Sequence, residues 1–271
     1  MKTQIETITP RIAEQYLTTM TTNRSLKSSV ISRYADDMIA GRWVLTHQGI
    51  AFDENGSLCD GQHRLQAIIK SGVSVSMAVT RGVDPTAIFN LDNGVGRTFR
   101  DSETIAGNPI PAAFPAALRS MYTLERTKGN AAIRAKFSSH SFLRSLADVH
   151  YDAVMFSLRC FSQSVNNHTH GVYSGPVLGV VARAFYTQDH DRLESFGLIM
   201  RTGMTTSIQD SAAITFRNWK ISAAPTGSVG QKLSYLKCES ALIAFLEKRP
   251  LSKLYKREEE FFPVPTNDLG I

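Results

Sequence analysis

The chain has 271 residues, of which 42% are hydrophobic and 20% are charged, and its formal net charge at pH 7 is +6. This composition is ordinary for a globular protein with one large domain or two smaller ones. No apolar run approaches the roughly 18 residues that a membrane-spanning helix needs, and the N-terminus lacks the apolar region of a secretion signal. We therefore expect no membrane partner and a cytoplasmic location.

Cysteine usage and charge narrow the class of protein further. Cys59, Cys160 and Cys238 are scattered and lack CxxC spacing, which argues against a disulfide framework and against a zinc site. Reduced thiols fit a cytoplasmic compartment. The moderate excess of positive charge suits a polyanionic partner such as DNA or a nucleotide.

The first 45 residues are predicted to be mainly helical. Residues 1–9 look extended, and Thr9-Pro10 begins a helix, because threonine caps helices and proline suits their first position. A second helix is predicted over 26–40, followed by a short strand at 44–45. The predicted buried face of this second helix, against which Trp43 is expected to pack, carries Val30, Ile31, Tyr34, Met38 and Ile39.

Residues 50–72 read as strand, turn, strand and helix. Ile50 to Phe52 is a short apolar run, and Asp53-Glu54-Asn55-Gly56 has the residues of a hairpin turn. A second short strand follows over 57–59. Asp60 stands where a helix N-cap is expected, and Gly72 ends the helix. Residues 73–81 then alternate apolar and polar side chains, which predicts a strand with one buried face.

The helix start at Asp60 has the features of a phosphate-binding turn. Gln62, His63 and Arg64 fall in the first turn, where unpaired backbone N–H groups and the helix dipole favour an anion. Gly61 has no side chain, so a ligand could approach the backbone closely. Arg64 adds a guanidinium suited to phosphate. The alternative is an ordinary helix start with solvated polar residues.

The motif Asp60-Gly61-Gln62-His63-Arg64-Leu65 resembles the DGQHR signature of the ParB/sulfiredoxin-like superfamily. This superfamily includes partition proteins, sulfiredoxins, free-serine kinases and DndB-type proteins of DNA sulfur modification, and the resemblance is nearest to related bacteriophage proteins. It covers roughly the first 105 residues. Gln62 stands where sulfiredoxins carry their cysteine, so sulfinic-acid reduction is not expected. Partition proteins carry two arginines in place of His63-Arg64.

The resemblance also implicates residues outside this motif. Arg24 is similar to an early basic residue that superfamily members place near the nucleotide. Asp92, Arg97 and Thr98 resemble an Asp-x-Gly-x-x-Arg-Thr element of the phage proteins, where Arg97 and Thr98 could contact phosphate. If a metal is used, Asp60 and Asp92 are the carboxylates placed to hold Mg²⁺ against phosphate. A solvated loop arginine and a structural salt bridge are the alternatives for Arg24 and for the Asp92–Arg97 pair.

A Gly/Pro-rich break over 106–111 predicts a domain boundary. We expect an α+β fold, in which a ParB/sulfiredoxin-like domain over 1–106, with a small mixed sheet and helices, precedes an all-helical domain over 112–271. The predicted helices of the second domain span 114–126, 139–146, 153–162, 176–186, 192–200, 208–219 and 232–247. Residues 253–265 are predicted to be an irregular closing segment.

Two functions from different classes follow from these patterns. The first is a nucleotide-phosphate-binding protein of a phage or mobile element, an ATP- or CTP-dependent phosphotransferase or NTPase acting on or with DNA. There Arg64 would stabilise phosphoryl charge, His63 would position phosphate, and Asp60 would cap the helix, act as base or bind metal. The second is a non-catalytic DNA-binding protein of the DndB type, or a phage protein that binds a host protein. A homodimer is a further alternative for the partner of this chain.

Overall fold

The computed structural model describes residues 1–21, 25–85, 97–124, 131–161, 172–205, 207–255 and 260–265. These residues form two compact units. The first comprises Met1–Arg97 and Ala131–Phe142, and the second comprises Thr98–Asn130 and Leu143–Ile271. The predicted boundary at 106–111 thus lies within the second unit. The first unit also includes residues 131–142, which come from later in the chain.

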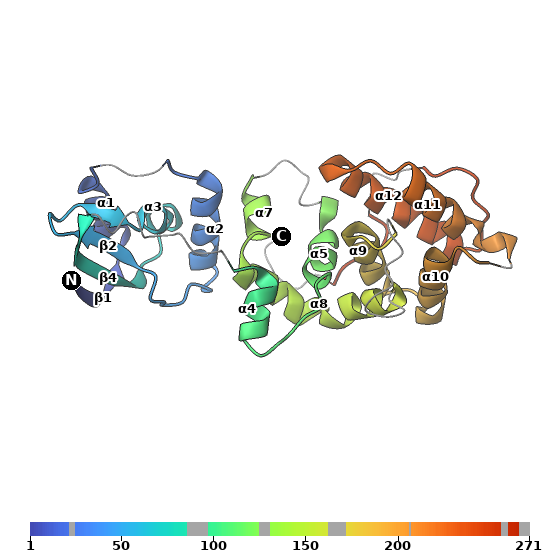
Figure 1. Cartoon of the computed structure of the whole chain (residues 1–271), viewed down its shortest axis with the longest axis horizontal. Coiled ribbons are helices and arrows are strands. Elements are labelled where there is room, and N and C mark those ends of the chain that lie inside the picture. The colour runs from blue at the N-terminus through green and yellow to red at the C-terminus, as the bar shows by residue number, and fades with distance from the viewer. Residues whose placement is uncertain are drawn as a thin grey trace. The chain divides into compact units, whose positions relative to one another are not determined.

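The first unit is built on a four-stranded mixed sheet with the order β1-β4-β2-β3 (Figure 1). Its strands are β1 (Lys2–Ile8), β2 (Ile50–Asp53), β3 (Leu58–Asp60) and β4 (Val75–Val83). β4 pairs antiparallel with β1 and parallel with β2, while β2 and β3 form an antiparallel hairpin. The α+β class is therefore confirmed for this unit.

The helices of the first unit are α1 (Pro10–Thr18), α2 (Ser28–Ile39), α3 (Gln62–Ser71) and α7 (Ala131–Lys136). Figure 1 shows α1 and α3 against the sheet, with α2 beside α3. Their apolar faces and the inward face of the sheet share one core: Ile8, Ala13, Ala35, Met38, Ile50, Phe52, Leu58, Leu65, Ala67, Ile68, Met77 and Val79. The core therefore fixes where α3 begins relative to the strand that precedes it.

Local sequence signals explain several of these boundaries. The Thr9 hydroxyl accepts a hydrogen bond from the Ile12 N–H at 3.2 Å, and Pro10 opens α1, as predicted. In the β2–β3 turn, Asp53 Oδ1 accepts from the N–H groups of Asn55 and Ser57. The hairpin prediction is confirmed, and it delivers β3 directly into the start of α3.

The structure differs in some details from the elements predicted for the first unit, although the strand predicted over 73–81 is present as β4. Residues 44–45 form no strand, and both side chains are exposed. The strand predicted from Val73 begins at Val75. Ile39 is 63% exposed, whereas the polar Asp37 is buried, because its carboxylate accepts hydrogen bonds from the hydroxyl groups of Ser139 and Ser141.

Every described element of the second unit is helical. The helices are α4 (Phe99–Ile105), α5 (Phe114–Ser120), α8 (His140–Phe161), which begins in the first unit, α9 (Gly175–Ala184), α10 (His190–Thr202), the 3₁₀ turn η2 (Ile208–Asp210), α11 (Ser211–Ser222) and α12 (Gly227–Leu246). α9 is buried from Pro176 to its last residue. None of the described helices is both long enough and apolar enough to span a membrane.

The two helices predicted over 139–146 and 153–162 form one continuous helix, since α8 runs through His150. The His150 ring is fully buried, its Nε2 lies 2.7 Å from the Tyr122 hydroxyl, and its Nδ1 lies 2.7 Å from the Tyr186 hydroxyl. Burial lowers the pKa of His150 to about 4, and the positive charge of Arg183 acts in the same direction. The His150 side chain can therefore lie in the core, because two hydroxyl groups that are distant in sequence satisfy its ring nitrogens.

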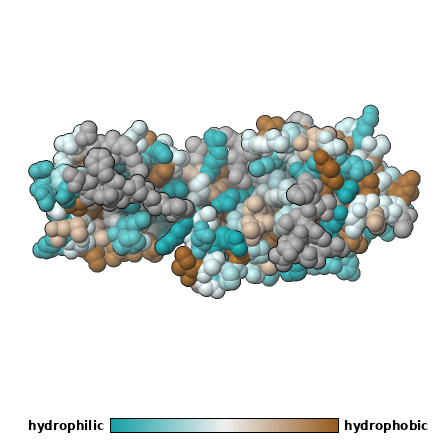
Figure 2. Space-filling model, in the orientation of Figure 1, coloured by the Kyte–Doolittle hydropathy of each residue, from teal (hydrophilic) through white to brown (hydrophobic). Residues whose placement is uncertain are grey.

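The C-terminal residues 260–265 are irregular, as predicted, and are held against the second unit. Phe262 is fully buried, its carbonyl accepts from Arg183 Nε at 2.7 Å, and its N–H donates to Glu239 Oε1 at 3.4 Å. The Glu260 carboxylate pairs with Arg183 Nη1 at 2.8 Å. On the face drawn in Figure 2, hydrophobic residues occur in small groups among hydrophilic ones in each unit.

Candidate functional site

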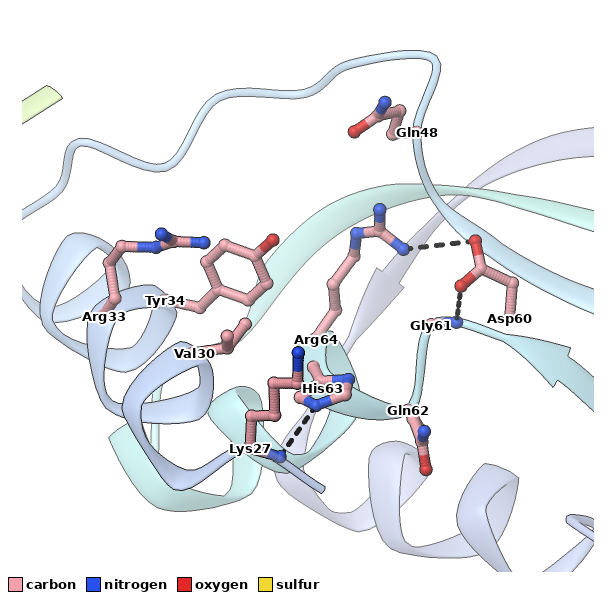
Figure 3. Close-up of a pocket in the computed structure, with 10 residues that line it drawn as sticks. All are labelled: Lys27, Val30, Arg33, Tyr34, Gln48, Asp60, Gly61, Gln62, His63 and Arg64. Atoms are coloured by element: carbon pink, nitrogen blue, oxygen red, sulfur yellow. Dashed lines mark hydrogen bonds and ion pairs between the residues drawn. The ribbon is translucent and has the colours of Figure 1, made fainter. Parts of the chain in front are cut away.

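A cavity of about 260 Å³ lies in the first unit, in front of the start of α3 (Figure 3). Its lining comes from the starts of two helices and from the loop that precedes β2. The described residues that line it are Lys27, Val30, Arg33, Tyr34, Gln48, Asp60, Gly61, Gln62, His63 and Arg64. Three of them are cationic at neutral pH, and Asp60 is the one carboxylate among them.

The predicted cap of α3 requires a correction. The N-cap is Gly61, not Asp60, and no side chain caps the helix. Asp60 ends β3, and its Oδ1 instead accepts a hydrogen bond from the Gly61 N–H at 2.7 Å. Asp60 is displaced from the cap because the chain turns through Gly61 at a φ of +104°, a conformation that glycine adopts readily.

Steric contact also requires glycine at position 61. A Cβ atom there would lie 3.1 Å from both Cα and Cγ1 of Ile50. A side chain would therefore push the turn away from β2. Gly49 has the same constraint, since its Cβ would lie 1.7 Å from the carbonyl oxygen of Ala78. Gly61 therefore lets the turn after β3 approach the start of β2, and Gly49 lets the loop before β2 approach β4.

Arg64 is held in place by this loop. Its Nη1 donates to the Gly49 carbonyl at 2.8 Å and lies 3.5 Å from Asp60 Oδ2. The arginine side chain is 15% exposed, whereas that of Asp60 is 38% exposed. Figure 3 shows the guanidinium between Tyr34 and Asp60, with Gln48 nearby. Arg64 is therefore a cation at the edge of a cavity, with one nitrogen used by the protein.

His63 connects the two helices that line the cavity. Its Nε2 accepts a hydrogen bond from the Lys27 backbone N–H at 3.0 Å, and the residue is 7% exposed. An accepting Nε2 means that the neutral ring carries its proton on Nδ1. Because Lys27 is the N-cap of α2, the imidazole attaches the start of α2 to the first turn of α3. Gln62 is buried and points to the other side of the turn from Arg64 (Figure 3).

The helix starts add to the positive potential of the cavity. Neither N-cap, Lys27 of α2 or Gly61 of α3, makes a side-chain capping bond. Each helix start carries a partial positive charge of about half a unit, which favours an anion. Lys27 and Arg33 add full charges from α2. The arrangement can therefore bind an anion through side chains from two helices.

The other predicted site residues have separate positions. Arg24 and Asp92 lie outside the described residues. Arg97 and Thr98 are exposed and are not among the described residues that line the cavity. Thr98 is the N-cap of α4, and its hydroxyl accepts from the Asp101 N–H at 3.2 Å. The structure thus brings together Asp60, Gly61, Gln62, His63 and Arg64 of the predicted set.

Sequence reasoning missed the contribution of α2 and of the loop before β2. Val30 and Tyr34 were predicted to face the core; Tyr34 does pack against it, but both residues are half-buried and also line the cavity. Lys27, Val30 and Arg33 recur every three residues along one side of α2, which was the available signal. Tyr34 also contacts Trp43 edge-on at 5.4 Å, which confirms that Trp43 packs against this helix.

The described residues do not by themselves form a magnesium site. No group of three or more His, Cys, Asp or Glu residues that could hold a metal ion occurs among them. The Asp60 carboxylate is already bonded to a backbone N–H and lies beside a guanidinium, an environment that disfavours a second cation. Mg²⁺ binding therefore remains a prediction, and the roles proposed for the cavity residues do not depend on it.

Comparison with known proteins gives this chain no relative. No family model matches it, no curated protein matches its sequence, and no solved structure matches its fold.

Proposed function

We propose that the first unit is a ParB/sulfiredoxin-like domain whose cavity binds the phosphates of a nucleotide, ATP or CTP, for a phosphotransfer or NTPase reaction that acts on or with DNA. The observation that carries this proposal is the cavity before α3, which Lys27, Arg33 and Arg64 line together with a single carboxylate, that of Asp60. Guanidinium groups and helix starts both suit a phosphate anion.

An aromatic side chain next to the cations supports a nucleotide over a bare anion. Tyr34 lines the cavity on the side away from Gly61, and Arg33 Cζ lies 5.1 Å from the centre of its ring (Figure 3). A base could stack on this ring while its phosphates reach Arg64 and the start of α3. Gln48 offers an amide that can donate to and accept from a base edge.

In the proposed reaction, Arg64 and the first turn of α3 stabilise negative charge on the phosphoryl group. Lys27 and Arg33 neutralise the remaining phosphate oxygens. His63 acts through position, because its Nε2 is bonded to the Lys27 backbone and keeps both helix starts in place.

A second candidate function is non-catalytic DNA binding, in which the cavity holds one backbone phosphate. The cavity volume of about 260 Å³ favours it, because pockets that enclose a small molecule usually exceed roughly 300 Å³. The net charge of +6 is compatible with this candidate as well.

Binding measurements separate the two candidates. Titration calorimetry with ATP, CTP and duplex DNA, each with and without Mg²⁺, is expected to show nucleotide binding that Arg64→Ala weakens at least tenfold. Arg11→Ala removes an exposed arginine on α1, outside the cavity lining, and is the matched control. DNA binding without nucleotide binding would favour the second candidate. Absence of both would refute the proposal, and release of labelled phosphate tests turnover.

A further inference from the structure

Asp60 contacts two donors at the start of α3 that an incoming phosphate could also use. Its Oδ1 accepts from the Gly61 N–H at 2.7 Å, and its Oδ2 lies 3.5 Å from Arg64 Nη1. Both donors border the cavity. A phosphate oxygen at the start of α3 would compete for the same N–H and the same guanidinium, and it would be repelled by the carboxylate charge.

The Arg64 side chain is fixed more firmly by the surrounding protein than the Asp60 side chain is. Arg64 is anchored by its 2.8 Å hydrogen bond to the Gly49 carbonyl, and its side chain is largely covered. The Asp60 side chain is 38% exposed at the end of β3, and the 3.5 Å separation is long for a charge-assisted hydrogen bond. Asp60 is therefore the partner that can leave, while Arg64 stays aimed at the cavity.

From this geometry, and on the basis of the function proposed above, we infer that Asp60 is an internal anion that the ligand displaces. A phosphate group takes over the Gly61 N–H and Arg64, and the carboxylate moves to solvent. The exchange favours ligands that carry two or more negative charges, such as phosphate monoesters and polyphosphates, over monoanions. Asp60 then sets the charge of the ligand, rather than acting as a base or a metal ligand.

Removal of the Asp60 charge distinguishes these roles. Asp60→Asn keeps an oxygen that can accept from the Gly61 N–H, and Asp60→Ser keeps a shorter one. The probe is inorganic triphosphate in the presence of EDTA, so that neither a base nor a metal contributes. If Asp60 is displaced, both variants bind the probe about tenfold more tightly than the wild type. Acetate, a monoanion, should compete with the probe more effectively in both variants than in the wild type.

Glu54→Gln is the matched control, because Glu54 is an exposed carboxylate in the nearby β2–β3 turn that does not line the cavity. It is expected to change affinity less than twofold. Equal or weaker binding by the Asp60 variants, or an equal gain in Glu54→Gln, would overturn the inference while leaving phosphate binding intact. If neither the wild type nor the variants bind triphosphate or nucleotide, the proposed function fails as well.

Discussion

The Nε2 atom of His63 lies 3.0 Å from the backbone nitrogen of Lys27, so the second residue of α3 accepts the N–H of the residue that caps α2. This contact joins two helix starts that are distant in sequence and both border the cavity. The imidazole thereby determines how the cations of α2 are placed relative to Arg64.

His63→Ala is expected to reduce the free energy of unfolding by about 1–3 kcal/mol, because it leaves a half-buried backbone N–H without its acceptor. Phosphate affinity should fall as well, since the start of α2 loses its attachment. Urea denaturation and calorimetry measure the two effects. His47→Ala, at an exposed histidine, should change neither. An unchanged affinity in a folded His63→Ala protein would contradict the positioning role.

Gly61→Ala is expected to destabilise the protein more than Gly56→Ala. Both glycines have a positive φ, which costs an alanine roughly 1–2 kcal/mol. Only at Gly61 would the new Cβ approach the Ile50 backbone, at 3.1 Å, whereas Gly56 has open space around it. The difference between the urea unfolding midpoints of the two variants therefore measures the destabilisation caused by the steric contact at Gly61. Equal losses would show that the turn can move away from β2 at no cost.

The buried His150 predicts a loss of stability in acid. Burial lowers its pKa to about 4 in the folded state, so between the unfolded value of 6.5 and 4 the unfolded chain binds more protons. Stability should therefore fall as the pH decreases through this window, by an amount on the order of 3 kcal/mol. His150→Gln should lose this part of the pH dependence. Denaturation of both proteins at pH 7 and pH 4.5 tests the prediction, and parallel curves would contradict it.

Two neighbouring phenylalanines near the C-terminus should differ in their effect on stability. Phe262 is fully buried, so Phe262→Ala is expected to cost about 3–5 kcal/mol. Phe261 is 48% exposed, and Phe261→Ala should cost less than about 1 kcal/mol. Thermal unfolding of the two variants provides the comparison. Similar small losses would mean that the 260–265 segment contributes little to the second unit.

Features that depend on neighbouring residues could be predicted from the sequence. The Thr9-Pro10 start, the turn at Asp53 and the helix that ends at Gly72 each rest on chemistry within a few positions, and all three are present. The motif from Asp60 to Arg64 was likewise located correctly as a strand-to-helix turn. Its resemblance to the ParB/sulfiredoxin-like superfamily remains a prediction.

Features that depend on distant partners could not be predicted. His150 interrupts an apolar pattern, but its ring nitrogens are satisfied by the hydroxyl groups of Tyr122 and Tyr186, which lie in turns just after α5 and α9. Val30 was predicted to be a core residue because helical periodicity does not distinguish a face that packs from one that borders a cavity. The role of Gly49 depends on its approach to β4, which no local pattern encodes. The fold was therefore more predictable than the composition of the site.

The discontinuity of the first unit has a consequence for biosynthesis. Residues 131–142 contribute Ser139 and Ser141 to the buried Asp37 carboxylate, yet they follow the sheet by more than forty positions. During translation, the Asp37 carboxylate lacks these two hydrogen-bond donors until residues 131–142 have left the ribosome. A nascent chain that stops at residue 106 would lack both serine hydroxyl groups and would be an incompletely folded intermediate, prone to capture by chaperones. A gene fragment that ends at residue 106 would lack them as well.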